Sequence, residues 1–360
     1  MASAATKQLL SQLRLPIIGA PLFIVSNPKL VIAQCAAGIV GSFPALNARP
    51  QEKLDEWLRE IKLQLADKDG AAPFAVNQIV HRSNDRLMRD MELIVKHEVP
   101  LVITSLGARE DVNEAVHSYG GMVLHDVISD KFARKAISKG ADGVVAVAAG
   151  AGGHAGTISP FALIQEIREW FDGPVALSGS IASGRAVLAA QAAGADFAYI
   201  GSAFIACDEA NASGDYKQAI ADCASSDIVY SNLFTGVHGN CNAAPAAPAR
   251  RARSPTPSPA HSHFSLASAA LALPDLRPSI VNAGLDPDNL PSSDPSAMKF
   301  GSGEDSATAK KAWRDVWGCG QGIGAVRSVG STAKYVDQLA GEYETASKSL
   351  DRERARFSGS

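Results

Sequence analysis

The chain has 360 residues, of which 46% are hydrophobic, and a formal net charge of −3. Charges of both signs are mixed along the sequence and no apolar run reaches the roughly 18–20 residues of a membrane span, so we expect neither a nucleic-acid partner nor a membrane partner. The five cysteines form no C-x-x-C pair, which argues against a disulfide framework and against a structural zinc site and favours a reducing, cytoplasmic location.

Short apolar segments typical of β-strands alternate with helical patterns between residues 16 and 204. The predicted strands cover Ile17–Phe23, Ile39–Pro44, Phe74–Ile79, Leu101–Leu106, Met122–Val127, Gly143–Val147, Val175–Ser178 and Phe197–Ile200. The predicted helices between them cover Pro28–Ala37, Gln51–Ala66, Asn84–His97, Glu110–Ser118, Lys131–Lys139, Pro160–Phe171 and Gly184–Ala193. Several strands are apolar almost throughout, as expected for parallel strands buried on both faces.

Eight such units predict an α/β fold, a (β/α)8 TIM barrel. The alternative is an open doubly wound sheet, which is disfavoured because no dinucleotide-binding fingerprint follows the first strand. Gly140 and Gly194 each follow a helical pattern and precede the next strand, as helix-ending glycines do.

After Cys207 the alternation ends, and further helices are predicted at Asp208–Ser225, Ser306–Trp317 and Thr332–Arg356. The expected layout is therefore a barrel over residues 1–235, an insertion over 241–275 and extra C-terminal helices over 276–360 that pack on the barrel.

Residues 241–275 are dominated by Ala, Pro, Ser and Arg, a composition that cannot form a packed core and predicts disorder. The segment is either a flexible loop insertion or a retained intron. If the codons of Cys241 and Asp275 were TGT and GAC, excision from the GT of the first to the G of the second would leave one tyrosine codon. A peptide of the native protein spanning 242–274 would exclude the intron.

The run Gly150-Ala151-Gly152-Gly153-His154-Ala155-Gly156-Thr157 follows the sixth predicted strand. Glycine lets a backbone lie close to a planar ligand, and histidine titrates near neutral pH. Barrel enzymes place their active sites on the loops after the strands. We therefore predict that His154 is a general base beside a flat cofactor. A hydrogen-bond donor to a ligand and an ordinary loop histidine are the alternatives.

Two turns of small residues, Ser178-Gly179-Ser180-Ile181 and Gly201-Ser202, follow the seventh and eighth predicted strands. Tight strand-to-helix turns alone would need small residues. Because barrels commonly bind phosphate at both of these loops, their joint occurrence predicts a phosphate site.

Polar side chains also occur late in two strands. Asn77 would be costly to bury without a partner, so it either contacts a heteroaromatic ring or satisfies a backbone group. His125 and Asp126 occupy the matching end of the fifth predicted strand; a solvated loop pair is the simpler interpretation, and they are given a secondary role.

With these motifs the chain resembles the nitronate monooxygenases, formerly called 2-nitropropane dioxygenases, which are FMN enzymes built on a (β/α)8 barrel. The resemblance depends on Pro16-Ile17-Ile18-Gly19-Ala20-Pro21, Phe74-Ala75-Val76-Asn77, Ala151-Gly152-Gly153-His154-Ala155-Gly156, Ser178-Gly179-Ser180-Ile181-Ala182-Ser183-Gly184, Gly194-Ala195-Asp196 with Gly201-Ser202, and Gly320-Gln321-Gly322-Ile323-Gly324.

The resemblance implies an FMN cofactor and oxidation of a nitroalkane or alkyl nitronate by O2 to a carbonyl compound and nitrite. His154 would remove the α-proton of a nitroalkane or orient a preformed nitronate. The implied cofactor-binding residues are Ala20, Pro21 and Leu22 (through their backbone), Asn77 and Gly152 (at the flavin), and Gly179, Ser180, Gly201 and Ser202 (at the phosphate). No metal is implied, and a homo-oligomer is left open.

The chain departs from the family pattern at three positions. Many relatives have an acidic residue in place of Gly150 and a glycine in place of Ser180, and some have a lysine in place of Asp126. These changes leave the flavin site in place and the substrate open. The alternatives are an FMN-dependent NAD(P)H:quinone or enoyl-thioester reductase, and a barrel that binds a phosphate ligand without turnover. An inosine-monophosphate-dehydrogenase-like enzyme is disfavoured, because no cysteine follows the sixth strand.

Overall fold

Eight parallel strands form a barrel in the computed structural model, which describes residues 4–154, 156–231, 239–242 and 317–357. The strands are β1 (Ile17–Gly19), β2 (Gly41–Pro44), β3 (Phe74–Ile79), β4 (Leu101–Ser105), β5 (Met122–Val127), β6 (Gly143–Val147), β8 (Val175–Ser178) and β9 (Phe197–Ile200), in the order β1-β9-β8-β6-β5-β4-β3-β2. A parallel bridge between Ile18 and Val40 joins the two ends of this order and closes the sheet. The predicted (β/α)8 barrel is confirmed, and the open doubly wound sheet is excluded.

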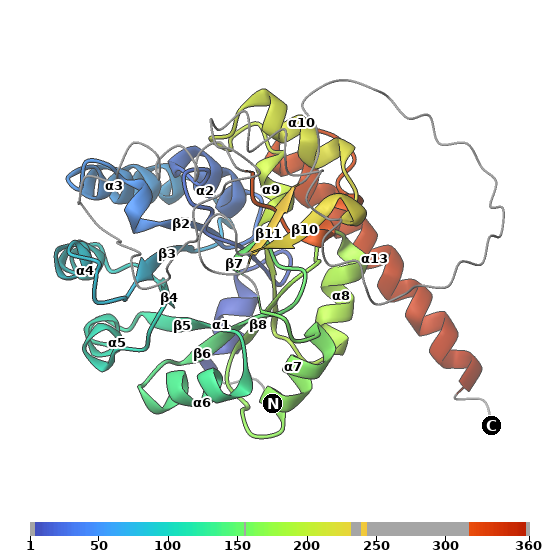
Figure 1. Cartoon of the computed structure of the whole chain (residues 1–360), viewed down its shortest axis with the longest axis horizontal. Coiled ribbons are helices and arrows are strands. Elements are labelled where there is room, and N and C mark those ends of the chain that lie inside the picture. Colours follow the sequence, from blue (N-terminus) through green and yellow to red (C-terminus); the bar gives the residue numbers. More distant parts are fainter. Residues whose placement is uncertain (1–3, 155, 232–238, 243–316, 358–360) are drawn as a thin grey trace.

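Helices surround the barrel (Figure 1). They are α1 (Ala4–Ser11), α2 (Pro28–Ala36), α3 (Lys53–Ala66), α4 (Leu87–Lys96), α5 (Glu110–His117), α6 (Asp130–Ser138), α7 (Pro160–Arg168), α8 (Gly184–Ala192), α9 (Ser202–Ile205), α10 (Gly214–Asp222) and α13 (Thr332–Phe357). Local chemistry sets their ends. Asn27 accepts the Leu30 N–H at 2.9 Å and so caps α2 ahead of Pro28. Gly140 and Gly194 have φ of +87° and +114°, as predicted for residues that end a helix.

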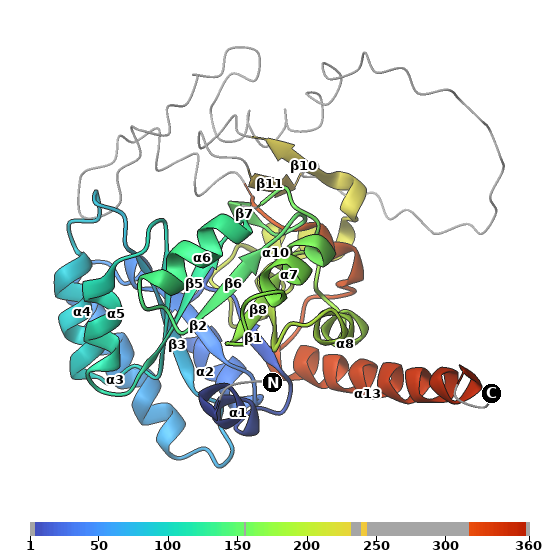
Figure 2. The same cartoon turned by 90° about the horizontal axis from the view of Figure 1, so that it is seen from below.

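The C-terminal helix α13 completes the helical layer, because it packs between α8 and α2. Gly184, the first residue of α8, lies so close to the α13 backbone at Leu339 and Tyr343 that a Cβ there would overlap it. The Gly184 N–H also donates to Glu342 Oε2 at 2.8 Å. The second half of α13 extends beyond the rest of the described chain (Figure 2).

The barrel interior is apolar in the layers that lie away from the carboxyl ends of the strands. Side chains from successive strands, including Ile18, Ile103, Leu124 and Phe197, form one buried cluster, and Leu9 of α1 packs against it. Because side chains alternate along a strand, the residues two positions after Ile103 and Leu124 also face the interior, nearer the carboxyl ends of β4 and β5. Those residues are Ser105 and Asp126, so the interior becomes polar toward this end.

The structure departs from the predicted elements in several places. β1 ends at Gly19 rather than Phe23, and the helix predicted from Asp208 begins at Gly214. The helix α1 has no predicted counterpart. Three short strands were also missed: β7 (Gly153–His154), β10 (Ile228–Ser231) and β11 (Gly239–Asn242), which form a separate antiparallel sheet.

The remaining predictions fall outside the described residues. They are the insertion, of which only the first two residues are described, and the helix at Ser306–Trp317, of which only Trp317 is described. Within the described residues, no helix combines the length and apolar character that crossing a membrane would require.

Candidate active site

The glycine-rich loop after β6 is held by a β-hairpin from beyond the last barrel strand. His154 pairs with Gly239, and Gly153 pairs with Asn240, in the antiparallel ladder between β7 and β11. The strands β7, β10 and β11 lie at the end of the barrel opposite α1 (Figure 2). This is the end where the barrel strands finish, as predicted. The structure describes the backbone of His154 but not its side chain.

Three backbone turns meet at the Gly150 carbonyl. It accepts the N–H of Ser180 at 3.3 Å and the N–H of Gln321 at 2.9 Å. A Cβ on Gly179 would lie 2.7 Å from the Ala149 carbonyl oxygen, so the turn after β8 packs directly against the turn after β6. The predicted residues Gly179 and Ser180 therefore lie beside the glycine-rich loop.

The turn after β9 joins the same group. Ser202 Oγ accepts the N–H of Gly320 at 2.7 Å. A Cβ on Gly152 would lie 2.9 Å from Ser202 Oγ and 2.8 Å from the Gly320 nitrogen. Ser202 is also the first residue of α9, where backbone N–H groups have no partner within the helix. The predicted residues Gly152 and Ser202 are thus brought together, through a C-terminal segment to which the sequence assigned no role.

The loop after β1 contacts the other side of the β9 turn. The Ala20 N–H donates to the Ile200 carbonyl at 2.8 Å. A Cβ on Gly201 would lie 3.3 Å from Ala20 Cβ and 3.2 Å from Leu22 Cδ2. The predicted stretch Ala20–Leu22, with Pro21 between these two contacts, therefore lies beside Gly201.

One half-buried side chain holds this loop in place. Asn47 Nδ2 donates to the carbonyls of Leu22 at 2.9 Å and Ser26 at 2.8 Å, and its Oδ1 accepts the Ile24 N–H at 2.9 Å. Ile24 has a φ of +66°, which is rare for a β-branched residue. The three bonds of Asn47 offset this strain, and sequence reasoning missed the residue.

A chain of polar side chains crosses the barrel interior. Asn77 Nδ2 donates to the Ile103 carbonyl at 3.0 Å and to Ser105 Oγ at 2.7 Å. Ser105 Oγ then donates to Asp126 Oδ2 at 2.5 Å. Asn77 is therefore partnered, as its burial requires. Ser105 and Asp126 were not predicted as site residues, although their even spacing from Ile103 and Leu124 places them on the interior face.

His125 and Asp126 lie in β5, within the predicted bounds of that strand, but their interpretation as a solvated loop pair is wrong. His125 is buried, and its Nδ1 lies 2.6 Å from Thr104 Oγ1. Burial, with a smaller effect of the Lys135 charge, lowers the pKa of His125 to about 4. Burial raises the pKa of Asp126 to about 6, against an opposing hydrogen bond from Ser105. The pKa of Tyr199 lies well above its ordinary value, because of burial and then the Asp126 charge.

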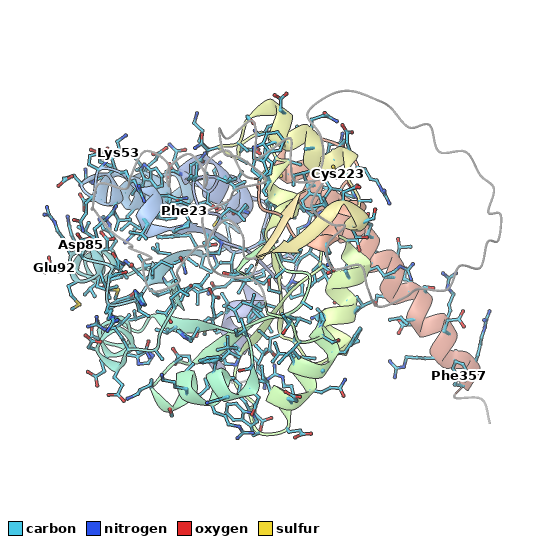
Figure 3. All side chains as sticks on the ribbon, viewed as in Figure 1. Phe23, Lys53, Asp85, Glu92, Cys223 and Phe357 are labelled. Carbon is cyan, nitrogen blue, oxygen red and sulfur yellow. The ribbon has the colours of Figure 1, made fainter. Side chains whose placement is uncertain are left out.

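Large apolar side chains are exposed on the loops at this end of the barrel. Phe23, Leu106 and Ile128 follow β1, β4 and β5, and each is 41–46% exposed. Phe23 is labelled in Figure 3. We call these three residues the apolar rim. Exposed apolar groups around a polar interior are typical of ligand-binding sites.

These residues fit a planar ligand that carries a phosphate. Glycines at 150, 152 and 179 let these turns pack closely against one another at one point, and the start of α9 presents backbone N–H groups beside them. Inside the barrel, Asp126 Oδ1 is buried and has no hydrogen-bond partner among the described residues. A buried oxygen of this kind is satisfied by an ordered water or by a ligand atom.

A family model described as nitronate monooxygenase matches residues 6–244. The nitronate monooxygenase of Pseudomonas aeruginosa is 28% identical over 251 residues, which cover 57% of this chain and 70% of that protein. Several other matches are shorter, and one curated relative is covered over only 40% of its length.

Solved structures share the fold. The nitroalkane oxidase of Streptomyces ansochromogenes superimposes with a TM-score of 0.72 at 23% identity, over 97% of this chain and 100% of that one. FabK of Thermotoga maritima gives a TM-score of 0.72 at 20% identity, over 98% and 100%.

Proposed function

The chain belongs to the nitronate monooxygenase family and is an enzyme, a flavin oxidoreductase, and on this premise we propose that it binds FMN and oxidises alkyl nitronates or nitroalkanes with O2. The products are a carbonyl compound and nitrite. The observation that carries the proposal is the convergence of the turns after β6, β8 and β9 on one point at the mouth of the barrel.

That convergence supports FMN as the particular flavin. The residues that would hold its phosphate are Gly179, Ser180, Gly201 and Ser202, of which Ser180 and Ser202 add hydroxyls to the backbone N–H groups of the turns. Ala20, Pro21 and Leu22 would line the ring system through their backbone. Asn77 and Gly152 complete the proposed contacts with the ring.

When bound, FMN supplies electron acceptance and reaction with O2. The protein supplies position and proton control. His154 would accept the α-proton of a neutral nitroalkane, and the pairing of its backbone with Gly239 fixes the place of its loop. A preformed nitronate needs no proton removed, so His154 would only orient it.

The apolar rim supports a substrate with an alkyl chain. Phe23, Leu106 and Ile128 would remove such a chain from water, which contributes roughly 0.8 kcal/mol for each buried CH2. We expect the enzyme to prefer nitronates of longer alkyl chain.

Location and partners remain part of the proposal. Cys35 and Cys207 are buried and form no disulfide, which supports a reducing compartment such as the cytoplasm. The proposed partners are the small-molecule substrate and O2.

Oxygen uptake with ethyl and propyl nitronates tests the proposed reaction, with nitrite measured as the second product. Uptake that depends on nitronate supports it. Rapid NAD(P)H oxidation with a quinone or an enoyl thioester, and none with nitronates, would support the reductase alternative. A protein that stays colourless after incubation with FMN would instead support the phosphate-binding barrel without turnover.

A further inference from the structure

We propose that Asp126 is a hydrogen-bond donor to the flavin, with a proton on Oδ1 that is shared with a carbonyl oxygen or ring nitrogen of the cofactor. The inference rests on the proposed FMN cofactor and adds a contact that the sequence motifs do not assign.

The hydrogen bonds inside the barrel run in one direction, from Asn77 through Ser105 to Asp126. Asn77 Nδ2 faces the Ile103 carbonyl, which can only accept, so the amide nitrogen lies on this side and donates to Ser105 Oγ as well. Ser105 then directs its own hydroxyl hydrogen at Asp126 Oδ2, which accepts it. Oδ2 is committed as an acceptor, and Oδ1 is the oxygen left to carry a proton.

The second oxygen of Asp126, Oδ1, lies in surroundings that favour its protonated form. This atom is buried and accepts no hydrogen bond from the described residues. An unpaired buried carboxylate oxygen is costly, whereas a carboxylic acid that donates to a ligand acceptor is satisfied. Asp126 shares the interior face of β5 with Leu124, toward the mouth where the turns converge.

The surroundings of Asp126 do not stabilise a negative charge on its carboxyl group. Among the described residues, no lysine or arginine forms an ion pair with Asp126 or lowers its pKa. β3 and β4 contribute the neutral side chains Asn77 and Ser105, and β6 contributes only valine and alanine beside glycine. From another strand, Tyr199 couples to Asp126, and the pKa of Tyr199 is raised first by burial and then by the Asp126 charge.

The neighbouring histidine does not supply a compensating charge. His125 lies next to Asp126 on β5 but projects to the other face, where it pairs with Thr104, and its pKa is lowered to about 4. With no cation to stabilise the carboxylate, burial raises the pKa of Asp126 to about 6.

The variant Asp126→Asn distinguishes a side chain that donates a hydrogen bond to the flavin from one that accepts a hydrogen bond from it. An asparagine can accept from Ser105 through its oxygen and present an N–H where Oδ1 stands, so it mimics the neutral acid at every pH. Asp126→Ala removes the group. Far-ultraviolet circular dichroism and thermal unfolding of each variant would show that the barrel is intact.

The experiment measures FMN dissociation constants for the wild type and Asp126→Asn from pH 5 to pH 8, by quenching of flavin fluorescence. The wild type must take up a proton to bind above its pKa of about 6. Its dissociation constant, divided by that of Asp126→Asn, should therefore rise by about tenfold per pH unit above that value. The ratio cancels the titration of the FMN phosphate and of His154, because both proteins share them.

Three outcomes overturn the inference. A ratio that does not change with pH excludes proton uptake by Asp126. Much weaker binding by Asp126→Asn at every pH shows that an ionised Asp126 accepts from the ring. In both cases tight FMN binding by the wild type leaves the proposed function standing. If neither protein binds FMN at any pH, the inference and the proposed function fail together.

Discussion

The Ser180 hydroxyl occupies the space into which a side chain at Gly150 would project. Both residues have left-handed backbones, with φ of +85° at Gly150 and +58° at Ser180. The two positions at which the turns depart from the family pattern are therefore in contact. A Cβ at position 150 would overlap the Ser180 hydroxyl, so a side chain at 150 requires a smaller residue at 180.

This contact predicts non-additive mutations. Gly150→Ala should lose roughly 1–3 kcal/mol of stability, from overlap with the Ser180 hydroxyl and from the positive φ. Adding Ser180→Gly should recover the part due to overlap. A double-mutant cycle in denaturant should give a coupling of at least about 0.5 kcal/mol. Strict additivity would show that the two positions are independent.

A second prediction concerns the docking of α13. Gly184→Ala should lose roughly 1–3 kcal/mol, because its methyl would overlap the α13 backbone at Leu339. The matched control is Gly341→Ala, on α13 itself, where nothing lies within 4 Å of an added Cβ. That variant should gain up to about 1 kcal/mol from helix propensity. Denaturant unfolding of both compares them, and equal effects would contradict the packing of α8 on α13.

The loop after β1 should depend on Asn47. Asn47→Ala removes three hydrogen bonds to residues 22–26 and should release the strained backbone of Ile24. We expect faster hydrogen exchange at the Ile24 amide and weaker FMN binding. The control is Asn211→Ala, which removes a bond of 3.0 Å to the Ile24 carbonyl from an exposed position. Similar losses of amide protection and of FMN affinity in the two variants would show that Asn47 does not hold the loop more strongly than Asn211.

The FMN-free protein should become less stable as the pH rises from about 4 to about 6. The unfolded chain releases the Asp126 proton near its ordinary pKa of 3.8, but the folded chain, with a pKa of about 6, retains it longer, so the folded state binds more protons in this window. The loss should amount to at most about 3 kcal/mol and should stop above pH 6. Subtracting the unfolding free energy of Asp126→Asn from that of the wild type at each pH isolates the contribution of Asp126, because the other titrating groups are common to both proteins. A difference that grows in favour of the wild type with pH would contradict the raised pKa.

His154→Ala should retain FMN and lose roughly 10²–10⁴-fold in turnover of neutral nitroalkanes, as expected when a general base is removed. Turnover of preformed nitronates should persist. Steady-state oxygen uptake with both substrate forms separates the roles. Undiminished turnover of nitroalkanes would exclude His154 as the base, and loss with both forms would indicate a binding role.

The barrel could be predicted because its strands are buried on both faces. β3, β5, β6, β8 and β9 have the predicted bounds, and the ends of β8 and β9 coincide with the glycines at 179 and 201. β1 was predicted too long, because Leu22 and Phe23 continue the apolar run but belong to the loop clamped by Asn47. Such a clamp acts across distant residues and leaves no local pattern.

The site was predictable where small residues mark close backbone approach, as at Gly179 and Ser202. It was not predictable where contacts join distant segments. The pairing of His154 with Gly239 and the bond from Gly320 to Ser202 are of this kind. Asp126 was interpreted as one of a solvated pair, yet the alternation from Leu124 was sufficient to place it inside the barrel.

The visible absorption spectrum of the purified protein, recorded after incubation with FMN and removal of unbound cofactor, tests the central claim most directly. We predict flavin absorption bands with close to one FMN per chain. A protein without visible absorption after this treatment would contradict the assignment of the turns after β6, β8 and β9 as an FMN site.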